Sequence, residues 1–158
     1  HGLVNLDVVE RFGCVSRMDT LQAAILRFRL KWLPAIVEKR RQNAKTYRTL
    51  LDSDYVSVPS DKDKEFNTYH TFVIQIDARD KLRAYLLAHG IPTAIHYPVP
   101  IHLQPAASWL GYGVGSFPRA ELQAKRILSL PINQYLSEAQ TNVVSETINR
   151  FFASGIQR

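Results

Sequence analysis

The sequence predicts an α+β domain, in which a few short strands form a small sheet and helices pack against one face of it. Apolar residues recur at helical spacing in several segments, and shorter segments between them alternate with the period of a strand. Proline and glycine separate these segments, so each element is short. Hydrophobic residues make up 46% of the 158 residues and charged residues 22%, which is enough for one core with a wet surface.

Each helical segment has a recognisable beginning. Asp19 is expected to cap the first helix, whose inner stripe starts with Leu21. Pro34 is expected in the first turn of the second helix, because proline lacks the N–H that an interior position needs. Ser137 and Gln140 form a capping box before the closing helix. The two remaining helix beginnings are assigned to Asp77 and Ser116.

Strand-like alternation is shorter and occurs in three places. The clearest is 69–76, in which alternate residues from His70 to Ile76 share one face. Two shorter strands are expected at 55–58 and 93–96. The sheet is therefore expected to be small, and most of the buried surface is expected to come from helices.

The helical segment near the N-terminus has apolar residues on more than one side, around Leu30 and Trp32. Such a segment usually packs against more than its own small domain. We therefore expect this segment to pack against a partner domain or subunit that the 158 residues do not include. The chain begins at His1 rather than at Met, which adds to the expectation that it is part of a longer polypeptide.

Composition limits the classes of protein. Lysine and arginine number 20 against 14 acidic residues, so the net charge is +6, which is compatible with an anionic partner or with a solvated surface. Cys14 is the only cysteine, which excludes an internal disulfide and favours the cytoplasm. No apolar run approaches the roughly 20 residues of a membrane span. The basic second helix lacks interleaved aromatics, so neither a membrane nor a nucleic acid is the expected partner.

The densest group of chemically useful side chains lies in 96–105. His96, Tyr97, His102 and Gln104 occur there among prolines, which hold a loop in few conformations. Imidazole and phenol groups bind phosphate oxygens and sugar hydroxyls well, so the loop is a candidate binding site. The histidines are six residues apart and no third ligand is in view, so no metal site is expected.

A second candidate site is the pair Ser16 and Arg17, just before the first helix. Backbone N–H groups at a helix N-terminus attract anions, and the Arg17 guanidinium adds a charge with bidentate geometry. The pair therefore fits a phosphate. A capping turn with a surface arginine explains the same residues, and the sequence pattern alone leaves both interpretations open.

Several short runs then follow one another in a specific order. In chain order they begin with 16–26 and continue with Arg40, Arg41, Ala44, Tyr47, 69–72, 79–82, 90–93, His96, Tyr97, Pro98, 102–105, Phe117, Pro118, Glu121, 129–131 and 136–138. Each run is weak alone, but the ordered set with its spacing covers essentially the whole chain. It resembles the sugar-nucleotide aminotransferases of the DegT/DnrJ/StrS group.

The resemblance implies the type I fold of enzymes that use pyridoxal 5'-phosphate (PLP). In that fold a large N-terminal domain with a mainly parallel sheet supplies the Schiff-base lysine and the carboxylate that pairs with the pyridinium nitrogen. This chain would then supply the end of that domain, 1–33, and the small C-terminal domain, 34–158. A long interdomain helical segment would precede the small domain.

The resemblance also implies a reaction and its partners. An amino group passes from glutamate by way of PLP to a keto-sugar linked to a nucleotide, as in polysaccharide biosynthesis. The active sites of the family form at a dimer interface, so a homodimer is expected. The expected partners are thus a nucleotide-sugar substrate, glutamate as amino donor and a second copy of the chain.

Site residues follow from the resemblance position by position. Ser16 and Arg17 correspond to a segment that binds the cofactor phosphate of the neighbouring subunit. Family members commonly have Asn two residues before the Arg, and Val15 stands there in this chain. A valine side chain cannot donate that hydrogen bond. The residues expected to bind substrate are His96, Tyr97 and His102.

The lysines of this chain do not match the family's Schiff-base position, which is expected upstream of His1. No catalytic residue is therefore expected within the 158 residues, and the chain alone is expected to be inactive. Two other classes remain open. Val15 favours a regulatory or structural homologue without catalysis, and the basic charge leaves a nucleic-acid-binding domain as the third.

Overall fold

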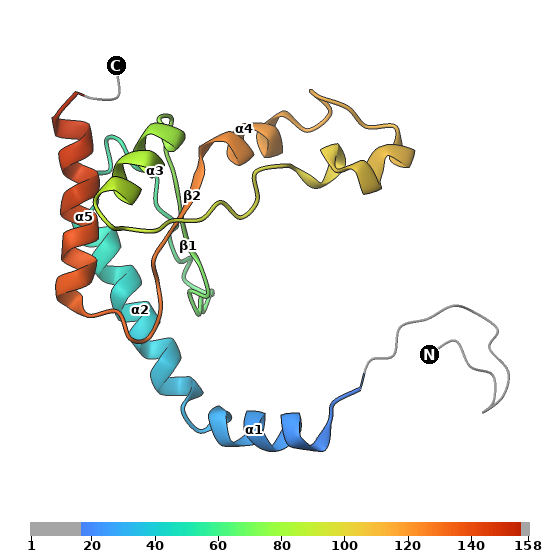
Figure 1. Ribbon diagram of the computed structural model, residues 1–158, viewed down its shortest axis with the longest axis vertical. Helices are drawn as coiled ribbons and strands as arrows, with labels where there is room; N and C mark the ends of the chain where they lie inside the picture. Colours follow the sequence, from blue (N-terminus) through green and yellow to red (C-terminus); the bar gives the residue numbers. More distant parts are fainter. Residues whose placement is uncertain (1–16, 156–158) are drawn as a thin grey trace, which may run out of the picture. The chain divides into compact units, whose positions relative to one another are not determined.

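The computed structural model describes residues 17–155 of the chain (Figure 1). It divides into two compact units, 1–34 and 35–158. The first unit contains helix α1 and the first two residues of α2, and the second contains the rest of α2, the sheet and the other helices. Within the described range, no helix combines the length and the apolar character needed to cross a membrane.

Helix α1 (Thr20–Leu30) begins at a capping box, as the sequence predicts. The Asp19 carboxylate accepts a hydrogen bond from the Leu21 N–H at 2.8 Å, and Gln22 Oε1 accepts one from the Asp19 N–H at 3.4 Å. No residue of α1 is buried, and even Phe28 is 61% exposed. The apolar side chains of α1 therefore find no core among the described residues.

Helix α2 (Leu33–Leu50) is fastened to the chain that follows the sheet. Asn43 Nδ2 donates to the Asn133 carbonyl at 3.0 Å, and the Tyr47 hydroxyl donates to the Pro131 carbonyl at 2.8 Å. Asn43 and Tyr47 are both buried, so their polar atoms need these partners. Burial raises the pKa of Tyr47, which keeps its hydroxyl protonated and able to donate.

The sheet consists of two antiparallel strands, β1 (Phe72–Gln75) and β2 (Ile127–Leu130). Phe72 lies opposite Leu130, and Gln75 lies opposite Ile127. Single bridges extend the sheet at both edges. Ser57 exchanges two hydrogen bonds with Gln75, and Ala94 exchanges two with Ser129.

The remaining elements are three helices and two short 3-10 turns. The helices are α3 (Arg79–Ala88), α4 (Pro118–Arg126) and α5 (Glu138–Ala153), and the turns are η1 (Ile101–Leu103) and η2 (Pro105–Leu110). Residues 95–117, which include both turns, leave the sheet after the Ala94 bridge and return to it through α4 (Figure 1). We call this segment the arm.

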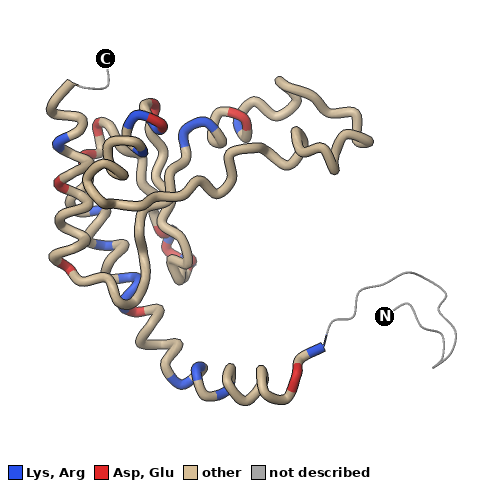
Figure 2. Tube along the Cα trace, in the orientation of Figure 1, with Lys and Arg blue, Asp and Glu red and all other residues tan. Residues whose placement is uncertain are grey.

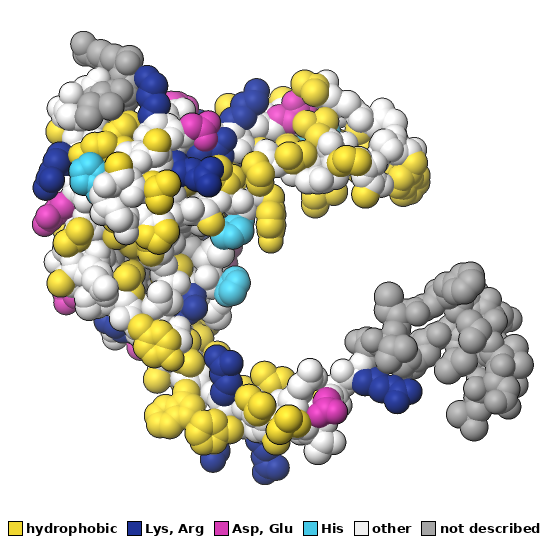
Figure 3. Space-filling model, viewed as in Figure 1, with side chains coloured by type: hydrophobic (Ala, Val, Ile, Leu, Met, Phe, Trp, Pro, Cys, Tyr) yellow, Lys and Arg dark blue, Asp and Glu magenta, His cyan; other side chains and the backbone are white. Residues whose placement is uncertain are grey.

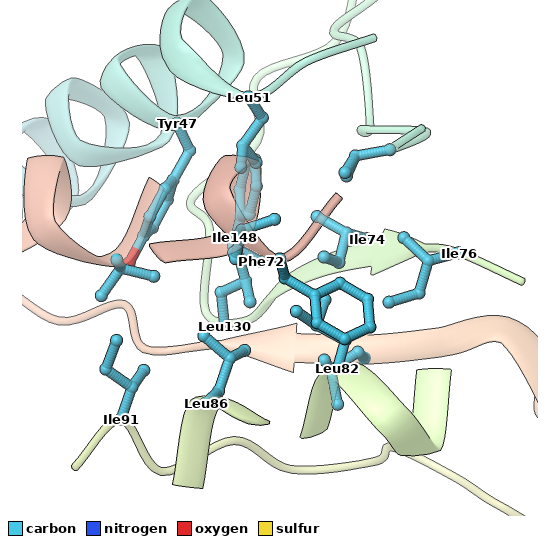
Figure 4. Close-up of a cluster of buried hydrophobic side chains, with 14 of the residues drawn as sticks. Tyr47, Leu51, Phe72, Ile74, Ile76, Leu82, Leu86, Ile91, Leu130 and Ile148 are labelled. Atoms are coloured by element: carbon cyan, nitrogen blue, oxygen red, sulfur yellow. The ribbon is translucent and has the colours of Figure 1, made fainter. Parts of the chain in front are cut away.

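The core is one cluster beneath the sheet. Successive side chains of a strand point to opposite faces, so Phe72 and Ile74 share one face, and both are fully buried. Figure 4 shows Tyr47 pointing into this cluster from α2, Leu51 from the residue directly after α2, and Leu82 and Leu86 from α3. The cluster also takes in these further buried residues: Ala44, Val56, Tyr69, Ile76, Ile91, Leu128, Leu130, Val144, Ile148, Phe151 and Phe152.

The strand expected at 69–76 is shorter than its alternation indicates. Tyr69 has a φ of 48°, in the left-handed region that an extended strand cannot contain. Arg40 Nη1 donates to the Tyr69 and His70 carbonyls, both at 3.0 Å, so these groups bond to a side chain instead of to a neighbouring strand. The strands expected at 55–58 and 93–96 are likewise reduced to single bridges.

Two further local expectations were wrong. Asp77 does not cap α3, whose N-cap is Ala78; the Asp77 carboxylate instead lies 2.9 Å from Arg126 Nε. No strand is expected from the sequence after α4, where Ile127 and Leu128 continue the apolar stripe of that helix. Both residues belong to β2, because the backbone becomes extended at Ile127 (φ −70°, ψ 138°). A short apolar run before a proline fits a strand as well as a helix end, and pairing with β1 decides between them.

Candidate functional site

The arm lacks charged side chains. Figure 2 shows neither Lys and Arg nor Asp and Glu along it, while charges of both signs are spread over the helices. Figure 3 shows hydrophobic side chains gathered along the same segment. The most exposed of these are Ile101, Trp109 and Val114, at 80–86%. Any ligand of the arm is therefore recognised by apolar surface and neutral polar groups, not by a fixed charge on the arm itself.

His96 lies just after the point where the arm leaves the sheet. The bridge between Ala94 and Ser129 carries backbone hydrogen bonds of 3.2 and 2.7 Å, so the backbone beside His96 is tied to β2. His96 Nδ1 lies 2.9 Å from the Ser129 hydroxyl oxygen, and Ser129 itself is buried. This contact orients the exposed imidazole and leaves Nε2 to face a ligand.

Tyr97 extends the same surface. Its ring meets the His96 ring edge to face, with 5.6 Å between the ring centres. The side chain is exposed, so both its ring face and its hydroxyl are accessible. The sequence analysis placed His96 and Tyr97 together, and the structure brings them into contact.

His102 differs from His96 in burial and in its partners. It is buried in η1, and its Nε2 lies 3.1 Å from Glu121 Oε1. Its ring packs on the Phe117 ring with 4.8 Å between centres. An imidazole held in this way forms part of the arm's packed surface and ties η1 to α4, and it has little surface left for a ligand.

Glu121 is a site residue that sequence reasoning overlooked. Its carboxylate accepts hydrogen bonds from the Gly115 N–H, at 2.9 and 3.0 Å to its two oxygens, and from the Phe117 N–H at 3.2 Å. The Gly115 N–H, followed by the other donors, lowers the pKa of Glu121, so the group is ionised at neutral pH. The available signal was an acidic residue in the first turn of a helix that begins at Pro118.

An open groove of about 610 Å³ lies between the first part of the arm and α4. It brings His96, Tyr97 and His102 to one surface, together with side chains of α4 such as Gln123. Its other lining residues are Val99, Pro100, Ile101, Leu110, Tyr112, Phe117, Ala120, Ala124 and Ile127. The groove is mainly apolar, with hydrogen-bonding groups only at a few points, as is usual for small-molecule sites.

The other predicted binding segment is only partly described. Ser16 and Val15 lie outside the described residues. Arg17 is exposed and precedes α1. The Asp19 carboxylate already occupies the Leu21 N–H, so the beginning of α1 is itself capped by an anionic group. The described residues contain no group of three or more metal-binding side chains.

A second polar cluster joins α2 to the loop before β1. Asp61 accepts hydrogen bonds from Arg48 Nη2 at 3.2 Å, from Asn67 Nδ2 at 2.6 Å and from the Tyr69 hydroxyl. The Tyr69 hydroxyl, with the other donors, lowers the pKa of Asp61 to about 2. The Asp61 carboxylate is thus satisfied within the chain, and the cluster serves to hold a loop.

Comparison with known proteins identifies the family. Residues 1–149 match the model of the DegT/DnrJ/EryC1/StrS aminotransferase family, and the chain belongs to that family. Its small domain is that of a type I PLP-dependent aminotransferase, as the resemblance implied.

Two curated relatives and one solved structure illustrate the range of the family. A pleiotropic regulatory protein of Geobacillus stearothermophilus is 41% identical over 89% of this chain and 38% of its own length. The dTDP-3-amino-3,4,6-trideoxy-alpha-D-glucose transaminase of Streptomyces venezuelae is 37% identical over 90% of this chain and 38% of its own length. The crystal structure of DesV from S. venezuelae with a ketimine intermediate superposes with a TM-score of 0.85 at 36% identity, covering 95% of this chain and 41% of that one. The chain thus spans about two fifths of the length of the proteins it matches.

Proposed function

We propose that this chain is the C-terminal part of a PLP-dependent aminotransferase that transfers an amino group from glutamate to a nucleotide-linked keto-sugar. The observation that carries the proposal is the groove beside the oriented His96, on a domain whose relatives include nucleotide-sugar transaminases. The His96 imidazole and the Tyr97 phenol supply neutral hydrogen-bonding groups and a ring face. These groups suit the hydroxyls and the apolar face of a hexose. We assign direct substrate contact to His96 and Tyr97, and place His102 in the wall of the same groove on the substrate side.

We place cofactor binding in the segment before α1. PLP, when bound, supplies the electron sink for amino transfer. Arg17 is exposed and presents a guanidinium that fits a phosphate, whereas the capped beginning of α1 adds little attraction for an anion. We therefore assign phosphate binding to Arg17, with Ser16 beside it. We place no catalytic residue in this chain.

The assembly that we propose is a cytoplasmic homodimer. Support comes from α1, in which apolar side chains on more than one side remain unburied. A second copy or a preceding domain would remove that surface from water, at a gain of roughly 25 cal/mol for each Å². Nucleic acid is not a proposed partner, because the basic helix α2 offers no exposed aromatic side chain on which a base could stack, and its Tyr47 is buried.

The test is amino transfer by the complete gene product. With L-glutamate labelled at its nitrogen, PLP and a set of nucleotide-linked keto-sugars, we expect the label to appear on one sugar, detected by mass spectrometry. The 158-residue chain alone is the matched control and is expected to give no labelled product. A complete product that binds no PLP and transfers no label would overturn the proposal.

The second candidate is a regulatory homologue without catalysis. It is favoured by Val15, which stands where the family commonly has Asn, and by the 41% identity to a protein named as a pleiotropic regulator. The same assay separates the two functions. Tight PLP binding by the complete product supports the enzyme, whereas weak PLP binding with no label transferred to any sugar supports regulation.

A further inference from the structure

The Glu121 carboxylate of α4 accepts hydrogen bonds from both halves of the arm. His102, on the outgoing half, places its Nε2 3.1 Å from Glu121 Oε1. Gly115 and Phe117, on the returning half, donate their backbone N–H groups at 2.9 and 3.2 Å to the same oxygen. Because a carboxylate only accepts, His102 must carry a proton on Nε2. The two halves of the arm therefore meet at a single side chain of α4.

Few other interactions hold the arm closed. Only His102 and Ala107 are buried within it, so apolar burial contributes little to its conformation. Phe117 packs on the rings of His102 and Tyr112, with centres 4.8 and 5.0 Å away. These ring contacts lie directly beside the Glu121 carboxylate, and they depend on the same closure. Charge-assisted hydrogen bonds are about twice as strong as neutral ones, so the carboxylate is the strongest single contact at this junction.

We propose that Glu121 is a positioning residue for the arm: it joins the two halves through His102, Gly115 and Phe117, and so fixes the surface that carries His96 and Tyr97. His102 then acts through Glu121 and not by touching a ligand. The simpler alternative is that Glu121 only satisfies the N-terminal turn of α4. A helix cap would need the Phe117 N–H, but it would not need the buried imidazole from the other half of the arm.

We call the junction of His102, Gly115 and Phe117 with the Glu121 carboxylate the clamp. It is tested in the 158-residue chain, independently of any enzymatic activity. In Glu121→Ala we expect amide hydrogen exchange at Gly115 and Phe117 to accelerate about tenfold or more, because each N–H loses a charged acceptor. Glu121→Gln keeps one acceptor oxygen and is expected to accelerate exchange less, by about threefold. Glu138→Gln is the matched control, since Glu138 is the acidic residue in the first turn of α5.

A spectroscopic readout separates positioning from capping. Long-range proton–nitrogen NMR of the parent chain should show His102 protonated on Nε2, and Glu121→Ala should give a mixture of tautomers. The backbone resonances of His96 and Tyr97 should move in Glu121→Ala and stay in place in Glu138→Gln. Unchanged exchange at Gly115 would overturn the clamp. Altered exchange with unmoved His96 and Tyr97 would reduce Glu121 to a cap and overturn the positioning role.

A kinetic test rests on the proposed function and uses the complete gene product. Glu121→Gln should raise KM for the keto-sugar about tenfold while kcat stays within about twofold. The reason is that part of the binding free energy must then be used to order the arm. If the complete product has no aminotransferase activity, the proposed function fails, while the exchange and tautomer results still decide the clamp. A kcat loss without a change in KM would contradict the positioning role.

Discussion

The core cluster beneath the sheet and the arm that leaves the sheet after Ala94 are held by different interactions. In the core, Phe72 of β1 and Ile148 of α5 are fully buried, in one cluster with side chains of α2 and α3. In the arm, Ile101 and Trp109 are at least 80% exposed, and a polar junction at Glu121 closes the loop. Burial thus fixes the domain, whereas hydrogen bonds to one carboxylate shape its candidate binding surface.

The largest effect should come from the core. Phe72→Ala removes a fully buried ring that stacks on Tyr47, with 5.1 Å between ring centres. We expect a loss of about 3–5 kcal/mol in the free energy of unfolding, from lost apolar burial and from the cavity left behind. Urea unfolding followed by circular dichroism measures it. A loss below about 1 kcal/mol would show that this cluster is not the stabilising core.

A smaller effect is expected where a polar bond crosses the core. Tyr47→Phe keeps the ring and removes the hydroxyl that donates to the Pro131 carbonyl at 2.8 Å. The carbonyl then loses its partner, which should cost about 1 kcal/mol. The same urea titration applies, with Tyr135→Phe, an exposed tyrosine, as the control expected to change nothing.

Acid should loosen both carboxylate junctions while the core persists. The pKa of Asp61 is lowered from 3.8 to about 2, and that of Glu121 is also lowered. A lowered pKa in the folded state means stability that is present at neutral pH and lost as pH falls through the folded-state pKa. For Asp61 the loss should therefore fall between about pH 4 and pH 2. Amide exchange at Gly115 and Asn67, compared with Ile148, measures it; parallel loss at all three amides would contradict the distinction.

The smallest effect is expected in the 3-10 turn η2 of the arm. Trp109 is 80% exposed, so Trp109→Ser should change the free energy of unfolding by less than about 0.5 kcal/mol. Far-UV circular dichroism in urea is the suitable measurement, because the substitution removes one of the tryptophan reporters. A loss above about 2 kcal/mol would show that the arm is stabilised by burial after all.

The same comparison explains which features the sequence could predict. The Asp19 and Ser137 caps depend on residues three positions away, so local pattern was sufficient for both. Strand β2 was missed because Ile127 and Leu128 continue the apolar stripe of α4, and only pairing with the distant β1 makes them a strand. Helices therefore begin within two residues of where the sequence predicts, while the strands do not keep their expected bounds.

The candidate site divides in the same way. Tyr97 follows His96 directly in the sequence, so their proximity was predictable, whereas the support that Ser129 gives to His96 joins residues 33 positions apart. The bond between His102 and Glu121 spans 19 positions and was not foreseen. Residue type and loop rigidity indicated a binding loop, but the distinction between the exposed His96 and the buried His102 needed the three-dimensional structure.

The most direct test of the account is the role of His96 in the complete gene product. His96→Asn, compared with His89→Asn at the end of α3, should raise KM for the keto-sugar by about tenfold or more, because a substrate-facing hydrogen bond is lost. His89 does not line the groove, so its variant should match the parent. Equal kinetics for both variants would contradict the assignment of the groove beside His96 as the substrate side of the active site.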